Sequence, residues 1–405
     1  MTRWLMILLA GALGLAACSP PAPQTQVCTP VTDQGTVTGS LTPVTSLRVL
    51  DPDKTEVTPS QVVVTDSSFS ANTGDVLVSN CNDGLLRRVT GVSTQFVGGS
   101  GVSSQAVRKV YIQTENAALE DAIASGEVNL ETSLTIGEAT LVQALDGVSV
   151  QNFTGRINLT NVRFDIPGVP GASIALNGFI EQTLRPNFNL RFSSGSVELF
   201  RAGMSGTLRS QITATVQANA SYSPFNVTRE LASWNIKRVF LVGSVPVVVV
   251  VQPRLIAGVS SAASGKVTVE VGIAPTFTTN VQLDYNRTRP VQERWQNTFT
   301  ANFAVNPTFN YSVPVQGSGN AFAGLAMDIK FYGLAGPSLE AKPFIALTLN
   351  GNNGSAGLET GINGRSRVEA GFRVLGRGLE TSYDGPTIKQ ARSFSCQAPS
   401  TCTAN

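Results

Sequence analysis

Gly203–Tyr222 reads GMSGTLRSQITATVQANASY, and its apolar and polar side chains alternate with a period of two. Successive side chains of a strand point to opposite faces, whereas a helix would mix the two sets around its circumference. The apolar set is Met204, Leu208, Ile212, Ala214, Val216, Ala218 and Ala220, and the polar set is Thr207, Arg209, Gln211, Thr213, Thr215, Gln217 and Asn219. This stretch therefore predicts a long strand with one buried face and one exposed face.

Two further stretches repeat the pattern, Lys266–Tyr285 (KVTVEVGIAPTFTTNVQLDY) and Thr298–Val313 (TFTANFAVNPTFNYSV). At about 3.3 Å per residue, twenty residues of strand extend on the order of 65 Å, so we expect a tall sheet and an elongated domain. Pro275 and Pro307 interrupt these stretches and predict edge positions or bulges, because proline cannot donate to the ladder. A change of apolar phase predicts a bulge or tight bend at Ser193–Gly195.

Arg238–Leu255 (RVFLVGSVPVVVVVQPRL) is apolar throughout, rich in β-branched residues and broken by Gly243 and Pro246. This composition favours a strand buried on both faces near the centre of the fold over a transmembrane helix. Together the patterns predict an all-β chain, with a small N-terminal β module followed by a large elongated antiparallel β-sandwich. A closed β-barrel is the alternative. The expected strands exceed the 9 to 11 residues or so that cross a bilayer, which favours the sandwich.

Changes in composition along the chain predict its domain boundaries. We expect a signal peptide at 1–17, a Pro/Thr/Gln-rich tether at 18–45, the small β module at 46–113, the large antiparallel domain at 114–385 and a cysteine-containing tail at 386–405. The tether has few large apolar residues and cannot bury enough surface to offset the entropy of ordering.

Two local signals refine this division. Asn82–Gly84 (NDG) predicts a hairpin turn inside the small module. Glu115–Ser125 (ENAALEDAIAS) predicts one short helix that ends at Gly126, because Leu119, Ala122 and Ile123 share a helical face and acidic residues occupy the first turns.

Composition excludes several classes of function. Only 14% of residues are charged, the net charge is +2, and the basic residues are scattered, so the chain lacks the clustered Lys and Arg that bind nucleic acid. Histidine is absent, which rules out a Ser-His-Asp triad and any histidine-ligated metal or haem. We expect no cofactor, no metal and no enzymatic activity.

The remaining candidates for catalysis or sugar binding are isolated in the sequence. The acids are Asp284, Glu293, Asp328 and Glu340, and the lysines are Lys330 and Lys342. Positions on solvated strand faces or loops explain them more simply than a glycosidase-type carboxylate pair or a Ser/Lys site. An aromatic platform for sugars would comprise Tyr285, Trp295, Tyr311 and Tyr332. Core packing is the favoured interpretation, because Tyr285 and Tyr311 fall on apolar faces.

The N-terminus carries Arg3, an apolar run and Leu15–Cys18 (LAAC), which resembles the lipobox of bacterial lipoproteins. The run is shorter than the roughly 20 residues of a membrane-spanning helix. The resemblance implies cleavage before Cys18, acylation of Cys18 and attachment to a membrane. Because Ser19 follows instead of aspartate, it also implies the outer membrane of a two-membrane cell, at its periplasmic face or the cell surface.

The other four cysteines are Cys28, Cys81, Cys396 and Cys402, and none has CxxC spacing. An even number in an exported chain predicts two disulfides, with three possible connectivities. We favour Cys28–Cys81 and Cys396–Cys402, and free thiols are the alternative.

Five blocks of the sequence carry a further resemblance. In chain order they are GDVLVSN, GLLRRVTGV, QTENAALEDAIASGEV, VFLVGSVPVVVVVQPRL and FYGLAGPSLEAKPFIAL. Over about Gly74–Asp384 the chain resembles a functionally uncharacterised module of secreted and cell-surface bacterial and archaeal proteins. The resemblance implies a surface-exposed, β-rich structural or interaction domain and brings no established activity or binding residues.

Two functions follow as hypotheses. The first is a lipid-anchored cell-envelope protein with a non-enzymatic structural or adhesive role and an envelope polymer or protein as partner. The second is a carrier of an apolar ligand or lipid between its sheets, because Ala214, Ala218 and Ala220 could leave room for one.

Overall fold

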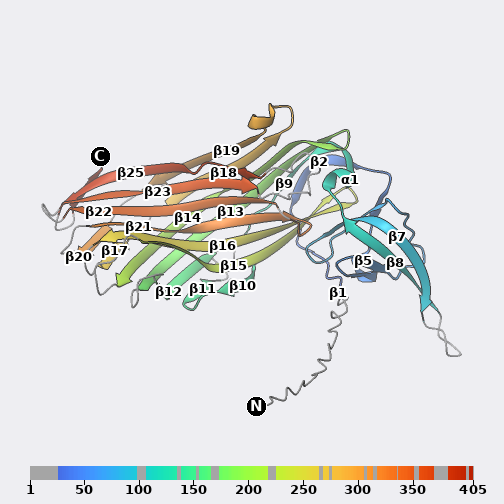
Figure 1. Cartoon of the computed structure of the whole chain (residues 1–405), viewed down its shortest axis with the longest axis horizontal. Coiled ribbons are helices and arrows are strands. Elements are labelled where there is room, and N and C mark those ends of the chain that lie inside the picture. The colour runs from blue at the N-terminus through green and yellow to red at the C-terminus, as the bar shows by residue number, and fades with distance from the viewer. Residues whose placement is uncertain are drawn as a thin grey trace, which may run out of the picture.

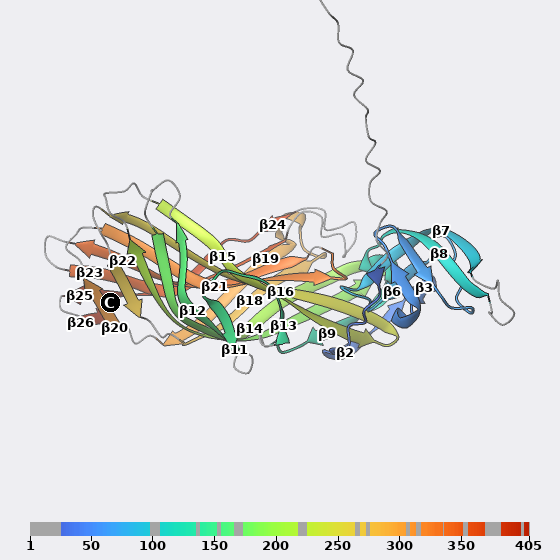
Figure 2. The same ribbon diagram turned by 90° about the horizontal axis from the view of Figure 1, so that it is seen from below.

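The computed structural model describes residues 26–97, 106–134, 138–151, 155–165, 173–217, 225–263, 268–272, 276–304, 308–312, 317–334, 336–350, 355–368, 382–397 and 401–404. Within this part of the chain, the strands form an N-terminal module and a long body of two facing sheets (Figure 1). The module lies at one end of the long axis of the body, as the view from below also shows (Figure 2). No helix among these residues is both long and apolar enough to cross a bilayer.

One layer of the body is an eight-stranded antiparallel sheet. Its strands are β11 (Val148–Gln151), β12 (Arg156–Asp165), β13 (Ser173–Ser193), β14 (Ser196–Gln217), β18 (Thr276–Asn286) and β19 (Trp295–Ala304), with β9 (Ile123–Glu131) on β13 and β2 (Thr36–Pro43) on β9. The alternation in β14 is confirmed, because Met204 and Leu208 are buried while Thr207 and Arg209 are exposed. The bend predicted at Ser193–Gly195 is the turn between β13 and β14, where Ser194 and Gly195 both have positive φ.

The other layer is a nine-stranded sheet. Its strands are β10 (Thr140–Ala144), β15 (Phe225–Val242), β16 (Val245–Ala263), β21 (Gly317–Phe331), β22 (Pro337–Asn350), β23 (Ser355–Val368), β25 (Ile388–Gln397) and β26 (Thr401–Ala404), with β24 (Tyr383–Asp384) on β23. Arg238–Leu255, predicted as one buried strand, instead contains the turn of the hairpin β15–β16, which lies at Gly243. Val247–Val251 are at most 2% exposed, which confirms their burial.

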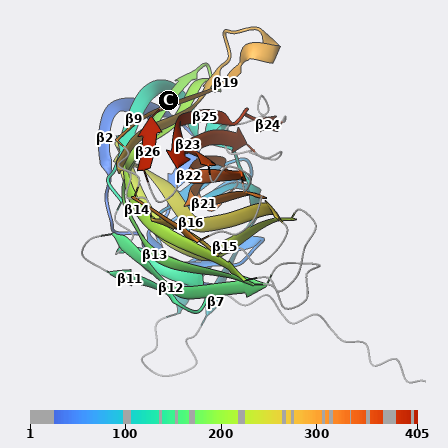
Figure 3. The same cartoon turned by 90° about the vertical axis from the view of Figure 1, so that its left-hand side faces the viewer.

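The body is sandwich-like, because the eight-stranded sheet curves around the nine-stranded sheet and their inner faces share one core (Figure 3). Aromatic rings join the two layers. Phe331 of the nine-stranded sheet lies 5.5 Å from Phe188 and 6.1 Å from Phe200 of the other, measured between ring centroids. The all-β sandwich prediction is therefore confirmed.

The other two predicted long strands are each divided. In place of Lys266–Tyr285 the structure has β17 (Thr268–Gly272) and β18, and in place of Thr298–Val313 it has β19 and β20 (Thr308–Ser312). β17 and β20 pair with each other as a separate two-stranded ribbon. Pro275 and Pro307 lie outside the described residues.

The module is a seven-stranded sheet. In spatial order its strands are β1 (Gln26–Val27), β4 (Thr55–Val57), β5 (Gln61–Val64), β8 (Val107–Asn116), β7 (Leu85–Val97), β6 (Val76–Ser79) and β3 (Leu47–Val49). Short 3-10 helices occupy Pro52–Lys54 in the module and Val291–Glu293 in the body. The turn predicted at Asn82–Gly84 is confirmed, since it connects β6 to β7 and the Gly84 N–H donates to the Cys81 carbonyl at 2.6 Å.

The tether predicted at 18–45 is wrong from Gln26 onward. β1 belongs to the module, and β2 extends the large sheet by pairing with β9. The polar composition of β2 reflects its edge position, where Val37 and Leu41 pack on the core and threonines face outward. Residues 18–25 lie outside the described part of the chain.

The short helix predicted near 115–125 is present but covers less of the segment than expected, because α1 comprises only Leu119–Ala122. β8 continues to Asn116 and β9 begins at Ile123, so sheet pairing replaces most of the predicted helix. Gly126 does not terminate a helix. It lies within β9 at φ +122°, where a Cβ would clash with the backbone of β2.

The module is fastened to the body by a shared core and by the turn at Asn82–Gly84. Val76, Val78 and Leu86 of the module belong to the same buried cluster as the inner faces of the two body sheets. A Cβ built on Gly84 would lie 2.7 Å from Cβ of Val248 and 2.8 Å from Cδ1 of Tyr332. Beside it, Asp83 and Lys237 form an ion pair at 2.7 Å. Module and body are therefore packed together through a common core.

Gly84→Ala should destabilise the protein more than Gly74→Ala. Both glycines have positive φ, +91° and +94°, so each substitution carries the left-handed penalty of about 1–2 kcal/mol. No atom lies within 4 Å of a Cβ at Gly74, whereas at Gly84 the added methyl group meets Val248 and Tyr332, which adds about 1–3 kcal/mol of overpacking. Urea unfolding of the two variants measures the difference. Equal losses would contradict the docking role of Gly84.

Candidate interaction surface

The outward side chains of β2, β9, β13, β14, β18 and β19 form a continuous polar surface, which we call the polar face. Antiparallel pairing aligns these side chains into rows that cross the strands. One row runs through Thr38, Asn129, Asn189, Arg201, Asp284 and Gln296. Another runs through Thr183, Thr207, Thr278 and Asn302. The result is an ordered array of hydroxyl, amide, carboxylate and guanidinium groups.

Hydrogen bonds between neighbouring strands hold these side chains in place. Arg201 Nε lies 2.5 Å from Asp284 Oδ1, and Gln282 donates to the other oxygen of Asp284 at 2.8 Å. The Thr183 and Thr207 hydroxyls lie 2.8 Å apart. The array is therefore partly preorganised before it meets a partner.

A second cluster lies where β9 meets β13. Arg191 Nε donates to Glu127 Oε2 at 2.8 Å, and Asn189 donates to Oε1 at 3.0 Å. The hydrogen bond from Arg191, followed by that from Asn189, lowers the pKa of the Glu127 carboxyl. Glu127 therefore stays ionised and holds the Arg191 guanidinium in a fixed orientation.

The basic residues in the strands of this sheet are all arginines, and its described strands contain no lysine. Arginine presents a planar fork of donors that matches carboxylate and phosphate geometry. Arg185 makes no ion pair within the described part of the chain, and Arg209 reaches Glu181 only at 3.8 Å with 59% of its side chain exposed. These two guanidinium groups are available to an acidic partner, while threonines and amides beside them can bond hydroxyl groups.

Among the acids and lysines considered as catalytic candidates, the structure brings Glu340 and Lys342 together as an ion pair. Asp284 lies on the polar face, whereas Asp328 pairs with Arg254 on the nine-stranded sheet at 2.7 Å. Glu340 is buried and lies 2.6 Å from Lys342. Glu293 is exposed in the short helix before β19, and Lys330 lies on β21. Among the described residues, no group of three or more His, Cys, Asp or Glu is arranged to hold a metal ion.

The four aromatic candidates do not form an exposed platform. Tyr285 and Tyr332 are buried, which confirms core packing for both. Trp295 packs against Tyr285 with ring centroids 5.0 Å apart, and the Tyr332 hydroxyl donates to the Pro246 carbonyl at 2.6 Å. The side chain of Tyr311 lies outside the described residues.

The cysteines divide into three groups. Cys28 and Cys81 form the predicted disulfide, with Cα atoms 5.0 Å apart, and it joins the segment after β1 to the turn that docks on the body. The backbone register of β25 and β26 places Cys396 directly opposite Cys402, so a disulfide between them stays a prediction with favourable placement. Cys18 lies outside the described residues.

The chain matches no known protein family, curated protein or solved structure. Its resemblance to the module of secreted and cell-surface proteins therefore stays a prediction.

The double variant Cys28→Ser/Cys81→Ser should lose about 2–4 kcal/mol of unfolding free energy, because the bridge spans 53 residues of sequence. Cys396→Ser/Cys402→Ser is the matched control and should lose less, since its loop is short. Denaturant unfolding measures both losses. Non-reducing peptide mapping should identify both bridges, and alkylation of Cys396 and Cys402 without reductant would contradict the second.

Proposed function

We propose that this chain is an exported, lipid-anchored cell-envelope protein with a non-enzymatic structural or interaction role, and that its polar face contacts an acidic envelope polymer. The observation that carries the proposal is the polar face itself. Thr, Asn, Gln, Arg and Asp side chains lie in register in rows that cross four to six strands of the sheet. Such rows suit an extended polymer, because hydrogen-bond donors and acceptors follow one another across the whole surface.

Two other observations support export and attachment to a membrane. The Cys28–Cys81 disulfide suits an oxidising compartment outside the cytoplasm. The lipobox-like Leu15–Cys18 supplies the proposed anchor. The shared core of module and body then provides a rigid support that carries the polar face away from the membrane.

A carrier of an apolar ligand is the second candidate, and one observation favours it. Leu141 of edge strand β10 stands opposite buried Trp234, on the inward side of the sheet, yet it is 54% exposed. Leu141 thus leaves an apolar side chain exposed to a ligand at this edge of the sandwich. The continuous packing of aromatic and aliphatic side chains between the sheets favours the structural role over the carrier.

Cys18→Ser should release the protein from the membrane fraction or leave it as an unprocessed precursor, because the acyl acceptor is removed. Cell fractionation with immunoblotting measures this, and Cys28→Ser is the control, since it removes a cysteine but not the anchor. Unchanged membrane retention and processing would contradict the anchor. Native mass spectrometry of released protein should show an unliganded chain, and stoichiometric lipid would instead favour the carrier.

Arg185→Ala/Arg209→Ala should weaken binding to the acidic polysaccharide polygalacturonate by about tenfold, because two charge-assisted contacts are lost. Arg229→Ala/Arg392→Ala, on exposed positions of the nine-stranded sheet, is the matched control and should bind like wild type. Affinity electrophoresis measures both, with neutral dextran as the comparison polymer. Equal binding of both variants, or no preference for the acidic polymer, would contradict the proposed role of the polar face.

A further inference from the structure

The hairpin of β7 and β8 extends beyond the rest of the module sheet. β6 pairs with β7 only at Leu85–Arg88, and β5 pairs with β8 only at Val110–Gln113. Beyond these flanking strands, residues 95–97 of β7 pair with residues 107–109 of β8 and form a two-stranded projection that we call the arm. Figure 1 shows the arm directed away from the body.

The arm exposes apolar side chains near its outer end. Phe96 is 71% exposed, Val97 45% and Val107 46%. Val97 and Val107 stand opposite each other on one face of the hairpin, whereas Phe96 stands opposite Arg108 on the other face. Apolar groups thus occupy both faces. A protein surface that docked on the arm would cover one of these faces, whereas an apolar phase would surround both.

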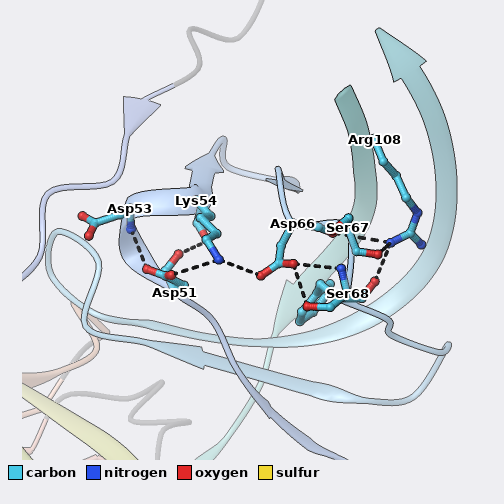
Figure 4. Close-up of polar contacts among 9 residues, drawn as sticks. Asp51, Asp53, Lys54, Asp66, Ser67, Ser68 and Arg108 are labelled. Carbon is cyan, nitrogen blue, oxygen red and sulfur yellow. Dashed lines mark hydrogen bonds and ion pairs between the residues drawn. The ribbon is translucent and has the colours of Figure 1, made fainter. Parts of the chain in front are cut away.

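A polar network in the module holds the arm through Arg108, which lies on the same face as Phe96 (Figure 4). The Arg108 guanidinium donates to the carbonyls of Ser67 and Phe69, each at 2.9 Å. The Asp66 carboxylate accepts from the hydroxyl and N–H of Ser68 at 2.7 and 2.8 Å and from Lys54 at 3.0 Å. Those two bonds from Ser68, followed by the bond from Lys54, lower the pKa of Asp66. The arm therefore projects from a fixed support.

The proposed acyl anchor places this arm near a bilayer. Gln26 begins β1 of the same module, and eight residue steps separate it from Cys18. Eight steps span at most about 29 Å when fully extended. β7, β8 and β1 belong to the same seven-stranded sheet, so the anchor holds the part of the molecule that carries the arm close to the bilayer.

We propose that the arm inserts Phe96, Val97 and Val107 into the surface of the same lipid membrane that holds Cys18, and so gives the protein a second attachment. This inference rests on the acyl anchor of the proposed function. Insertion removes the exposed apolar area of both faces of the hairpin from water, which is the favourable free-energy change that drives it.

The test places a tryptophan at the arm in the acylated full-length protein, reconstituted into vesicles of phosphatidylethanolamine and phosphatidylglycerol. Phe96→Trp should give emission that brominated acyl chains quench. Val291→Trp is the matched control, because Val291 is similarly exposed, at 68%, but lies in the body. Its added emission should not be quenched. Wild-type protein supplies the background from Trp234 and Trp295.

A second measurement distinguishes vesicle binding by the arm from vesicle binding by the acyl anchor. Unacylated protein that begins at residue 18 and carries Cys18→Ser should still partition weakly onto these vesicles, and adding Phe96→Asp should reduce that partitioning by about tenfold or more. If acylated Phe96→Trp protein stays on vesicles but its added emission is not quenched, membrane insertion of the arm is contradicted, while the acyl anchor is still supported. Absence of the acyl group by mass spectrometry would instead count against the anchor. Self-association that Phe96→Asp abolishes, without vesicle binding, would also overturn the proposal.

Discussion

Face-to-face packing of two long sheets is the constraint on which the rest of the structure depends. β13 and β14 are 21 and 22 residues long, and every second side chain on each is apolar or small along most of that length. Such faces are stable in water only when another apolar surface covers them. The nine-stranded sheet supplies that surface, with Phe331 between Phe188 and Phe200. Because the inner faces are occupied by the core, the outer faces, edges and projections of the sheets are where a partner can bind.

The period-two pattern was sufficient to predict the buried and exposed faces of β14, and the uninterrupted apolar run was sufficient to predict the burial of Val247–Val251. It was insufficient wherever pairing with distant strands decided the outcome. Glu115–Ser125 has good local helix signals, yet β9 pairs with β13 on one side and β2 on the other, and these ladders outweigh helix propensity. The same pairing explains why the polar segment Thr36–Pro43, which lacks a strong apolar signal, becomes a strand.

The polar face was likewise predictable only in part, because local patterns assign residues to a face but do not specify strand register. The polar residues of β14 and β19 could be assigned to one face from the sequence, but their alignment into rows depends on the register of Asp284 against Arg201 and Gln296. No local pattern specifies that register. The isolated acids could not be excluded as a site from sequence alone, and they are separated because Asp284 and Asp328 belong to different sheets. The even cysteine count left three connectivities, and the short loop between Cys396 and Cys402 favoured the one that pairs Cys28 with Cys81.

The rigid connection between module and body gives the two proposed contacts a joint consequence. Attachment through Cys18 alone would hold the protein at one point, whereas an inserted arm adds a second fixed point on the module. Val76, Val78 and Leu86 belong to the core of the body, and Asp83 pairs with Lys237, so an orientation imposed on the module is transmitted to the sheets. The polar face would then be presented at a constant angle to the membrane, which favours repeated contact with a polymer layer over occasional encounters.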